Sequence, residues 1–403
     1  LETLYSIFYD GSYSNIALDK ALSDIKENKA FISALVYGVT EKKITLDYFI
    51  DKYAQGRIKP KVRIVLWLGA YQLLFMDKVP SSASINESVK LVKEIKQDYY
   101  SKLVNAVLHK IDNDRQIPDD LSVKYSVPEN LINMWKKQYG EDVLNEFLPC
   151  INDKPPLFAI PNKKFVNSDE LLYELECDGI LGEAYDEFVL IENANDLTDS
   201  KAFKNGLFYI EDLSSFNCAN ALDALGDDLV LDMCSAPGGK AFTISQSMNN
   251  SGKIYCYDLH EHRLNLIKNS AKRLSIDNIY TDVNDATVYN ENIPKADKIL
   301  CDVPCSGFGI IRRKPEIRYK DLDSVKDLPQ IQYKILETSS RYLKDGGRII
   351  YSTCTLNKKE NENVVNKFLK DHSGYKLLKD KTVFPSTVGG DGFYYAIMVK
   401  NEN

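Results

Sequence analysis

Two cysteines follow short apolar runs at places where buried strands are expected to end. Cys305 lies in DVPCSG after the run 297–303, and Cys354 lies in STCT after the run 348–352. A thiolate adds to C6 of a pyrimidine ring, and this addition makes C5 nucleophilic enough to attack a methyl sulfonium. Backbone N–H groups and Lys240 could stabilise a thiolate at such a loop. The two thiols therefore indicate nucleophilic chemistry on a nucleobase.

The remaining cysteines have no metal-binding spacing. The chain holds eight cysteines without a CxxC pair and only four histidines, so we expect no metal site. Their scatter suits a reducing compartment. We interpret five of them as small buried hydrophobic residues: Cys150, Cys177, Cys218, Cys256 and Cys301.

A glycine-containing turn follows another apolar run. The segment LVLDMCSAPGGK (229–240) begins as a strand and ends where a helix should start. Its glycines let the backbone approach a ligand closely, and the N-terminus of a helix favours electron-rich groups. Four carboxylates lie at successive strand ends, where α/β sheets bind ligands: Asp232, Asp258, Asp285 and Asp302. Together they favour a nucleoside-bearing cofactor, with Asp258 on the ribose and Asp285 near the adenine. The turn alone does not distinguish NAD from S-adenosylmethionine.

The elements that must position these residues alternate from residue 228 onward. Strands are expected at 228–232, 253–258, 279–281, 297–303 and 348–352, with helices near 240–249, 261–274 and 328–344. This alternation predicts a parallel, doubly wound sheet, with a final strand Phe393–Lys400 closing one edge. Residues 226–403 should therefore form an α/β Rossmann-like domain.

The first 112 residues have helical apolar spacing and predict an all-α domain, which we extend to 145 to include an acidic connector. The 13-residue apolar run Ile64–Met76 is too short to cross a bilayer and predicts a buried helix. Ser84 and Glu87 could form a capping box for a helix starting near Ile85. Residues 146–225 predict a small α+β domain, with Ser168 as the N-cap of a helix and a further helix over 214–225.

Charge limits the kind of partner. The formal net charge of −7 excludes a protein coated in basic residues, so any nucleic-acid contact must be local. A basic run around Lys59, Lys61 and Arg63 is either a solvated surface or a phosphate-contacting patch. Glu2 and Asp10 occupy the region where a signal peptide would be basic. We expect a cytoplasmic monomer that contacts no membrane. Because Leu1 is not Met, we also expect that residues precede Leu1 in the natural protein.

A family resemblance makes these expectations specific. The segments LDMCSAPGGK, DVPCSGFGIIRRKPEIRYK and YSTCTLNKKENENVV resemble signature motifs of the Sun-type RNA cytosine-C5 methyltransferases. The segments VRIVLWLGAYQLLFM and SKLVNAVLHK resemble the NusB-type RNA-binding helical domain. The resemblance covers almost the whole chain. It implies transfer of a methyl group from S-adenosylmethionine to cytosine C5 in small-subunit ribosomal RNA.

The resemblance also implies roles for individual residues. Cys354 matches the nucleophile that bonds to C6, and Cys305 matches the cysteine that releases the methylated RNA. Asp302 matches the residue that contacts the cytosine edge, with Lys240 beside it. The implied cofactor site consists of Cys234, Ser235, Ala236, Pro237, Gly238, Gly239, Lys240, Asp258, Asp285 and Asp302, supported by Arg263. Candidate RNA contacts after the catalytic loop are Arg312, Arg313, Lys314 and Arg318.

The sequence differs from the family motifs at three positions, and it leaves several alternatives for the mechanism and the substrate. Ile160 stands where the family usually has Arg, Glu211 where Gln is usual, and Tyr319 where Trp is common. Cys305 would be the nucleophile if the site resembled DNA cytosine-C5 methyltransferases. The substrate could be tRNA, or the chain could be a non-enzymatic RNA-binding factor. Either Cys305 or a water could remove the C5 proton.

Overall fold

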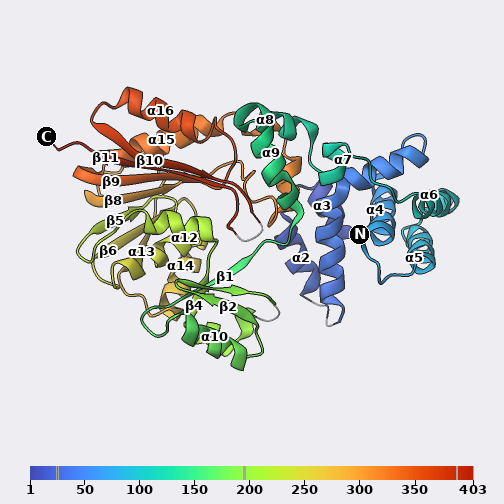
Figure 1. The fold of residues 1–403 in the computed structure, drawn as a ribbon, viewed down its shortest axis with the longest axis horizontal. Coiled ribbons are helices and arrows are strands. Elements are labelled where there is room, and N and C mark those ends of the chain that lie inside the picture. Colours follow the sequence, from blue (N-terminus) through green and yellow to red (C-terminus); the bar gives the residue numbers. More distant parts are fainter. Residues whose placement is uncertain (24, 26, 194–196, 387–388, 403) are drawn as a thin grey trace. The chain divides into compact units, whose positions relative to one another are not determined.

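The computed structural model describes residues 1–23, 25, 27–193, 197–386 and 389–402. The chain forms two compact units, which are described separately (Figure 1). The first contains Leu1–Asp153 and Ile311–Leu322, and the second contains Lys154–Ile310 and Asp323–Asn403. In the part of the chain that the structure describes, no helix is long and apolar enough to cross a membrane.

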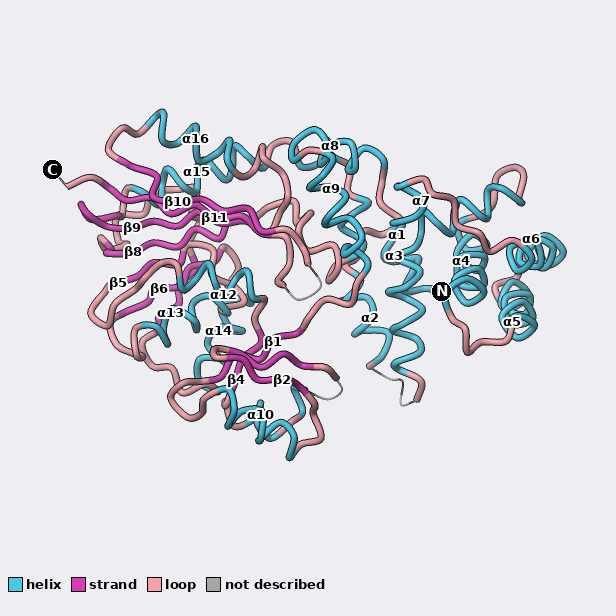
Figure 2. The backbone as a smooth tube through the Cα atoms, in the orientation of Figure 1, coloured by secondary structure: helices cyan, strands magenta, loops and turns pink. Residues whose placement is uncertain are grey.

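The first unit is built from helices (Figure 2). They are α1 (Glu2–Tyr9), α2 (Ser14–Leu22), α3 (Lys29–Tyr53), α4 (Pro60–Phe75), α5 (Ser81–Glu94), α6 (Ser101–Asn113), α7 (Leu121–Tyr125), α8 (Glu129–Tyr139) and α9 (Glu141–Phe147), with short 3₁₀ turns η1 (Asp98–Tyr100) and η2 (Leu148–Asn152). Helix α4 confirms the predicted buried helix, and its Trp67 lies in the core with Phe49. A Cβ at Gly38 would lie 2.0 Å from the ring of Tyr71, so any side chain there would displace that ring from the contact between α3 and α4.

The predicted capping box at Ser84 is wrong. Helix α5 begins at Ser81, directly after Pro80, and Ser84 lies inside it. The Ser84 hydroxyl is buried and donates to the Gly69 carbonyl at 3.1 Å, while Glu87 pairs with Lys90. Proline readily precedes a helix because its fixed φ directs the chain into the first turn. The helix therefore starts before the serine that the sequence pattern favoured.

Residues 311–322, which we call the strap, pack in the helical unit although the sequence predicted them within the catalytic domain. Arg318, in the 3₁₀ turn η4 (Pro315–Tyr319), is fully buried. Its Nη1 donates to the Glu41 carbonyl at 3.0 Å, the Ser126 carbonyl at 3.1 Å and Asn152 Oδ1 at 3.0 Å. Glu316 accepts hydrogen bonds from the amide and hydroxyl of Ser14. The strap lies here because its polar side chains have their partners on the helices.

We expect Arg318→Met to destabilise the helical unit by about 3 kcal/mol, because the Glu41 and Ser126 carbonyls and Asn152 Oδ1 lose the donor that the buried guanidinium supplies. Both tryptophans of the chain, Trp67 and Trp135, lie in this unit, so their fluorescence during urea unfolding reports on it alone. Lys314→Met makes the same kind of change at a less buried strap residue and should cost under about 1 kcal/mol. Equal unfolding midpoints for the two variants would contradict the structural role of Arg318.

The second unit contains a small antiparallel sheet ordered β2-β3-β1-β4. Its strands are β1 (Leu157–Pro161), β2 (Gly182–Tyr185), β3 (Phe188–Ile191) and β4 (Phe208–Ile210), accompanied by α10 (Ser168–Cys177) and α11 (Lys201–Lys204). The N-cap predicted at Ser168 is wrong by one residue. Asn167 caps α10 instead, in a capping box with Glu170. The amide side chain of Asn167 accepts from the Glu170 N–H, which leaves Ser168 as the first helical residue.

The second unit also contains a seven-stranded sheet ordered β10-β11-β9-β8-β5-β6-β7. Its strands are β5 (Leu229–Asp232), β6 (Lys253–Asp258), β7 (Ile279–Val283), β8 (Ala296–Asp302), β9 (Leu343–Thr353), β10 (Tyr375–Val383) and β11 (Phe393–Lys400). The five strands β5 to β9 are parallel as predicted, but β10 and β11 are antiparallel, so the sheet is mixed. The prediction that Phe393–Lys400 closes an edge is wrong, because β10 pairs with its outer side.

Helices cover both faces of the large sheet. They are α12 (Leu213–Asn220), α13 (Gly239–Ser247), α14 (Glu261–Arg273), α15 (Leu328–Ser340) and α16 (Glu362–Asp371). Helix α12 is shorter than predicted and ends before Asp223, which has a positive φ. Alternate residues of β5 enter different cores: Val230 packs with α12 to α14, and Leu231 packs with α15 and α16.

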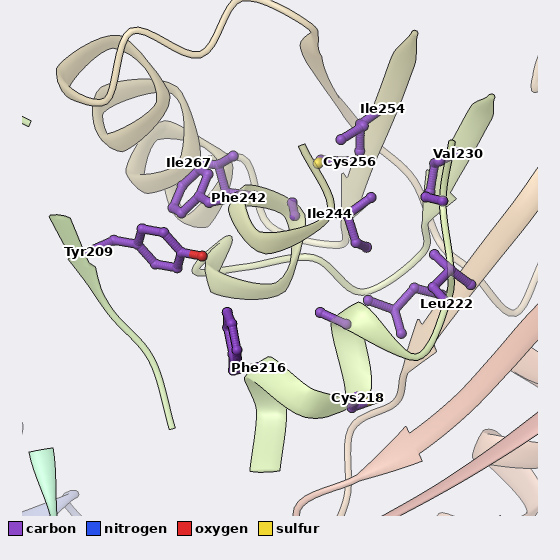
Figure 3. Close-up of a cluster of buried hydrophobic side chains, with 14 of the residues drawn as sticks. Tyr209, Phe216, Cys218, Leu222, Val230, Phe242, Ile244, Ile254, Cys256 and Ile267 are labelled. Atoms are coloured by element: carbon purple, nitrogen blue, oxygen red, sulfur yellow. The ribbon is translucent and has the colours of Figure 1, made fainter. Parts of the chain in front are cut away.

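The small sheet shares the first of these cores. Figure 3 shows Tyr209 of β4 and Phe216 of α12 beside Phe242 of α13. The small sheet is thereby held against the helix that follows the glycine turn.

Five cysteines were predicted to be small buried residues. The prediction is confirmed for Cys218, Cys256 and Cys301. It is wrong for Cys177, which is exposed, and for Cys150, which is partly exposed. Cys177 ends α10 on the solvent side, where no core is available.

Candidate active site

A cavity of about 360 Å³ opens at the carboxyl ends of β5 and β8. Its lining includes the turn 234–240, the strand ends Asp232 and Asp302, and residues 209–212 at the end of β4. This is the crevice in which open α/β sheets bind ligands. The expectation that Asp232, Asp302, Cys305 and Cys354 surround one pocket holds for the two aspartates, whereas neither cysteine is among the residues that line this cavity.

The glycine turn presents backbone to this cavity. Gly238 has φ +110°, a conformation that L side chains rarely adopt. A Cβ at Gly239 would lie 3.0 Å from Oε1 of Glu211. No side chain caps the N-terminus of α13 at this point. The first N–H groups of the helix therefore stay available to a ligand with electron-rich atoms.

Lys240 and Asp302 form an ion pair across the cavity. Lys240 Nζ lies 2.7 Å from Asp302 Oδ2, and the other oxygen of Asp302 accepts from Ser352 Oγ at 2.8 Å. Burial alone would lower the pKa of Lys240, but Asp302 and Glu211 outweigh burial and hold that pKa above its ordinary value. Lys240 therefore stays a fixed cation beside the carboxylate that the family resemblance assigns to the cytosine edge.

Two further carboxyl groups in the cavity are buried acids with raised pKa values. Burial raises the pKa of Asp232 to about 7, and Asp232 accepts a hydrogen bond from Ser235 Oγ at 2.8 Å. Its Oδ1 is buried without a hydrogen-bond partner among the described residues. Burial likewise raises the pKa of Glu211 to about 7, although Lys240 opposes this rise. The cavity thus holds acidic groups that a cationic ligand would stabilise in their charged form.

We expect Glu211→Gln to stabilise the protein at pH 8 and to change little at pH 5. Because burial raises the folded pKa of Glu211 from 4.5 to about 7, the folded protein keeps a proton that the unfolded chain loses. This stability is present at low pH and is lost as pH rises through 7. Because Gln cannot ionise, the variant should have a free energy of unfolding at pH 8 that is higher than that of wild type by up to roughly 3 kcal/mol. Scanning calorimetry at both pH values measures it, with exposed Glu291→Gln as the control; an equal gain at both would contradict the raised pKa.

Asp258, expected on the ribose, forms an ion pair with Arg263, and neither residue is among those that line the cavity. Arg263 Nη2 donates to the Ala236 carbonyl at 2.8 Å, and its Nη1 lies 3.1 Å from Asp258. This agrees with the supporting role expected for Arg263. Asp285 instead lines a separate shallow cavity with Leu259 and accepts from Thr287. The structure therefore does not bring Asp285 into the lining of the cavity that contains Lys240.

The two cysteines predicted to act together lie in contact. Asp302 and Ser352 are paired residues of β8 and β9, so the loops that follow them leave the sheet side by side. Cys305 Sγ lies 3.3 Å from Cys354 Sγ. The hydrogen bond to Cys354, together with burial, holds the pKa of Cys305 well above its ordinary value. This raised pKa favours the protonated form of Cys305, and either sulfur can donate the hydrogen bond between them.

The candidate RNA contacts have different surroundings within the helical unit. Lys61 pairs with Glu2 at 2.7 Å, and Lys59 donates to Gln97. Arg63 pairs with both Asp47 and Asp51. In the strap, Lys314 Nζ lies 5.3 Å above the ring of Tyr13, Arg313 is partly exposed, and Arg312 is only 8% exposed. The prediction for Arg318 is wrong, because its guanidinium is buried against backbone carbonyls.

Sequence patterns did not assign Glu211 to the pocket, nor Glu360 and Asn361 to the cysteine loops. Glu211 follows β4, so it carries the same signal, an acid after a strand, that identified the aspartates. Glu360 and Asn361 lie in NKKENEN, a polar run typical of a solvated turn, yet both are fully buried. Hydropathy does not distinguish these two residues from exposed ones, and the signal they carry is their place in the motif segment YSTCTLNKKENENVV.

Comparison with known proteins agrees with this architecture. A family model described as 16S rRNA methyltransferase RsmB/F matches residues 219–399, and a NusB family model matches residues 1–113. The chain is 32% identical over 437 residues to the probable ribosomal RNA small subunit methyltransferase B of Bacillus subtilis, with 99% of this chain and 97% of that protein covered. It is 29% identical to the ribosomal RNA small subunit methyltransferase B of Photorhabdus laumondii, covering 99% and 97%.

A solved structure shows the same fold along the chain. The crystal structure of PH0851 has a TM-score of 0.83 and 28% identity, and the match covers 99% of this chain and 96% of that one. The NusB-like helical domain and the Rossmann-like methyltransferase domain expected from the sequence are thereby confirmed. With these matches, the glycine turn at the cavity and the paired thiols on the loops after β8 and β9, the chain belongs to the RsmB (Sun) family of ribosomal RNA small subunit methyltransferases.

Proposed function

We propose that the protein transfers the methyl group of S-adenosylmethionine to C5 of a cytosine in small-subunit ribosomal RNA. The observation that carries this proposal is the pair of thiols 3.3 Å apart, on loops that follow the strand ends holding Asp302 and Ser352. Methylation of an oxygen or an exocyclic nitrogen needs no thiol, because those atoms are nucleophilic already. C5 of cytosine becomes nucleophilic only after another nucleophile has added to C6.

The cavity suits the methyl donor by its size and charge. About 360 Å³ lies within the range of small-molecule sites. The cavity is lined by two cationic side chains, Lys240 and Arg273, and by four carboxyl groups, those of Glu211, Asp212, Asp232 and Asp302. A ligand with a positively charged sulfonium matches this excess of acidic groups. The free N–H groups at the start of α13 are donors for the ligand. S-adenosylmethionine supplies an electrophilic methyl group when bound here.

The residues of this chain do the remaining chemistry. Cys354, as the thiolate, bonds to C6 of a cytosine that has been turned out of the RNA, while Asp302 and Lys240 hold the base edge and its developing charge. C5 takes the methyl group and then loses its proton. The C5–C6 double bond re-forms as the C6–S bond breaks, which returns the Cys354 thiolate. Each methyl transfer releases one proton.

Cys305 is the group proposed to accept the C5 proton. Before the reaction, its hydrogen bond to Cys354 is the largest cause of its raised pKa. Once Cys354 Sγ is bonded to C6, it no longer carries the negative charge that strengthened this hydrogen bond. The leading cause of the raised pKa is then gone, and Cys305 can lose its own proton to solvent and act as a base. This sequence gives the two thiols different roles at different steps.

RNA is proposed to reach this site along basic residues that lie outside the cavity. Lys59 and Lys61 on the helical unit, and Arg313 and Lys314 on the strap, are the candidates for phosphate contacts. The names of the relatives point to small-subunit ribosomal RNA rather than tRNA.

The proposal is tested by supplying labelled S-adenosylmethionine with unmodified small-subunit ribosomal RNA, and with tRNA as a second pool. Nucleoside analysis of the product should find the label in 5-methylcytidine from ribosomal RNA. Label in another nucleoside would overturn the C5 assignment. Binding of RNA with no transfer to either pool would favour the non-enzymatic alternative.

A further inference from the structure

The two cysteine-bearing loops are both braced by one dipeptide, Glu360–Asn361. It lies after the Cys354 loop and directly before α16, and both side chains are fully buried. Neither residue lines the cavity that contains Lys240. A buried carboxylate is costly unless its oxygens are hydrogen-bonded, so its presence beside the catalytic loops requires a structural reason.

Glu360 holds the residue after Cys305. Its Oε2 accepts from the Ser306 N–H at 2.9 Å, and its Oε1 accepts from the Ser306 hydroxyl at 2.6 Å. Two side-chain amides complete the set: Asn357 donates to Oε1 at 2.9 Å and Gln332 donates to Oε2 at 3.0 Å. A carboxylate has about four lone-pair positions, and here four donors occupy them.

Gln332 extends this grip to the residue before Cys305. It projects from α15, is fully buried, and its Nε2 also donates to the Pro304 carbonyl at 3.0 Å. The backbone is therefore held on both sides of Cys305, at Pro304 by Gln332 and at Ser306 by Glu360. This leaves the thiol of Cys305 little freedom to move along the loop.

Asn361 holds the Cys354 loop in the same way. Its Nδ2 donates to the Thr355 carbonyl at 2.9 Å, and its Oδ1 accepts from the Thr353 hydroxyl at 2.6 Å. One amide group thus spans both neighbours of Cys354. Glu360 therefore holds the loop that carries Cys305, and the next residue, Asn361, holds the loop that carries Cys354.

A hydroxyl pair joins the two loops directly. Ser306 Oγ and Thr355 Oγ1 lie 2.7 Å apart, and Thr355 Oγ1 also accepts from the Phe308 N–H at 3.2 Å. Ser306 and Thr355 are the residues that immediately follow the two cysteines. The contact of 3.3 Å between the sulfurs is therefore supported by a connected hydrogen-bond network.

We propose that Glu360 and Asn361 are positioning residues with separate duties: Glu360 sets the place of the Cys305 thiol and Asn361 sets the place of the Cys354 thiol. The inference rests on the proposed two-cysteine reaction for its catalytic consequence. Loosening the Cys305 loop should slow release of the RNA, because Cys354 still adds to C6. Loosening the Cys354 loop should slow the addition itself. The two substitutions therefore have opposite effects on the covalent protein–RNA adduct.

The test compares Glu360→Gln and Asn361→Ala on a denaturing gel with RNA and S-adenosylmethionine. A glutamine amide nitrogen cannot accept a hydrogen bond, so Glu360→Gln loses one side of the grip on the Cys305 loop. We expect its adduct to increase about tenfold over wild type while turnover falls, and the adduct of Asn361→Ala to fall together with its turnover. Matched controls are Glu362→Gln and Asn363→Ala, which make the same changes two residues further on.

A second measurement needs neither RNA nor the methyl donor. Alkylation by iodoacetamide, followed by peptide mass spectrometry, should change at Cys305 in Glu360→Gln and at Cys354 in Asn361→Ala. If either variant fails to fold, Ser306→Ala removes the Ser306 hydroxyl from Glu360 and from Thr355 but keeps the Ser306 N–H contact, and Thr353→Val removes one contact of Asn361. Equal losses of adduct and turnover in both variants, or alkylation changes shared by both cysteines, would overturn the separate duties. Absence of any adduct in wild type would count against the proposed function, while the alkylation pattern would still decide the positioning roles.

Discussion

Cys354→Ala should abolish methyl transfer, by at least about 10⁴-fold, and should form no covalent adduct with RNA. Cys305→Ala should instead form the adduct and fail to release it, so that the denaturing gel shows up to one RNA bound per protein chain. The reason is the proposed division of roles in the thiol pair, in which Cys354 adds to C6 and Cys305, whose pKa is raised by its hydrogen bond to Cys354, acts at release. Transfer assays and gels on the same preparations measure both effects.

Cys177→Ala is the matched control, because Cys177 is exposed at the end of α10 and takes no part in the cavity. It should leave transfer unchanged and trap nothing. A reversed pattern, with Cys354→Ala trapped and Cys305→Ala free of adduct, would assign the nucleophile to Cys305, as in DNA cytosine-C5 methyltransferases. Activity in both variants would remove the thiols from the mechanism.

Lys240→Met should lower kcat/KM by about 100-fold to 1000-fold while the protein stays folded. Lys240 is the cation that holds Asp302 at 2.7 Å and lowers the pKa of Glu211. Without it, Asp302 loses its ion-pair partner and keeps the hydrogen bond from Ser352, and the proposed stabilisation of charge on the base is lost. Steady-state methyl transfer at saturating S-adenosylmethionine measures the effect on RNA turnover.

Lys253→Met makes the same change at the exposed first residue of β6 and should alter kcat/KM less than about twofold. Lys240→Arg should recover part of the activity because it restores the charge without the geometry. Wild-type rates in Lys240→Met would mean that the pair with Asp302 only stabilises the fold.

The strands that carry the site could be predicted because apolar runs end in recognisable turns. Strand β6 occupies the predicted 253–258, and Asp302 ends β8 within one residue of the expected boundary. The helix after the glycine turn likewise followed from Gly238 and Gly239. These features depend on neighbouring residues, so a local pattern contains them.

Features that depend on distant partners could not be predicted. Strand β10 has four charged residues in nine and pairs at the edge of the sheet, so its sequence does not differ from an exposed loop. Arg318 looks like part of a surface basic run until Asn152 and Ser126 surround it. The grip of Glu360 on the Cys305 loop likewise joins residues 54 positions apart. Such contacts exist only in the folded chain.

The strap also limits how this protein can be divided or recombined. A fragment that ended at Asp153 would contain every helix from α1 to α9 but would lack the buried Arg318 and the Glu316 partner of Ser14. Exchange of the N-terminal half between relatives would join helices from one parent to a strap from another. Two of these contacts, Ser14 with Glu316 and Asn152 with Arg318, join side chains, so a chimera that keeps them has to carry residues 311–322 along with the helices that enclose them.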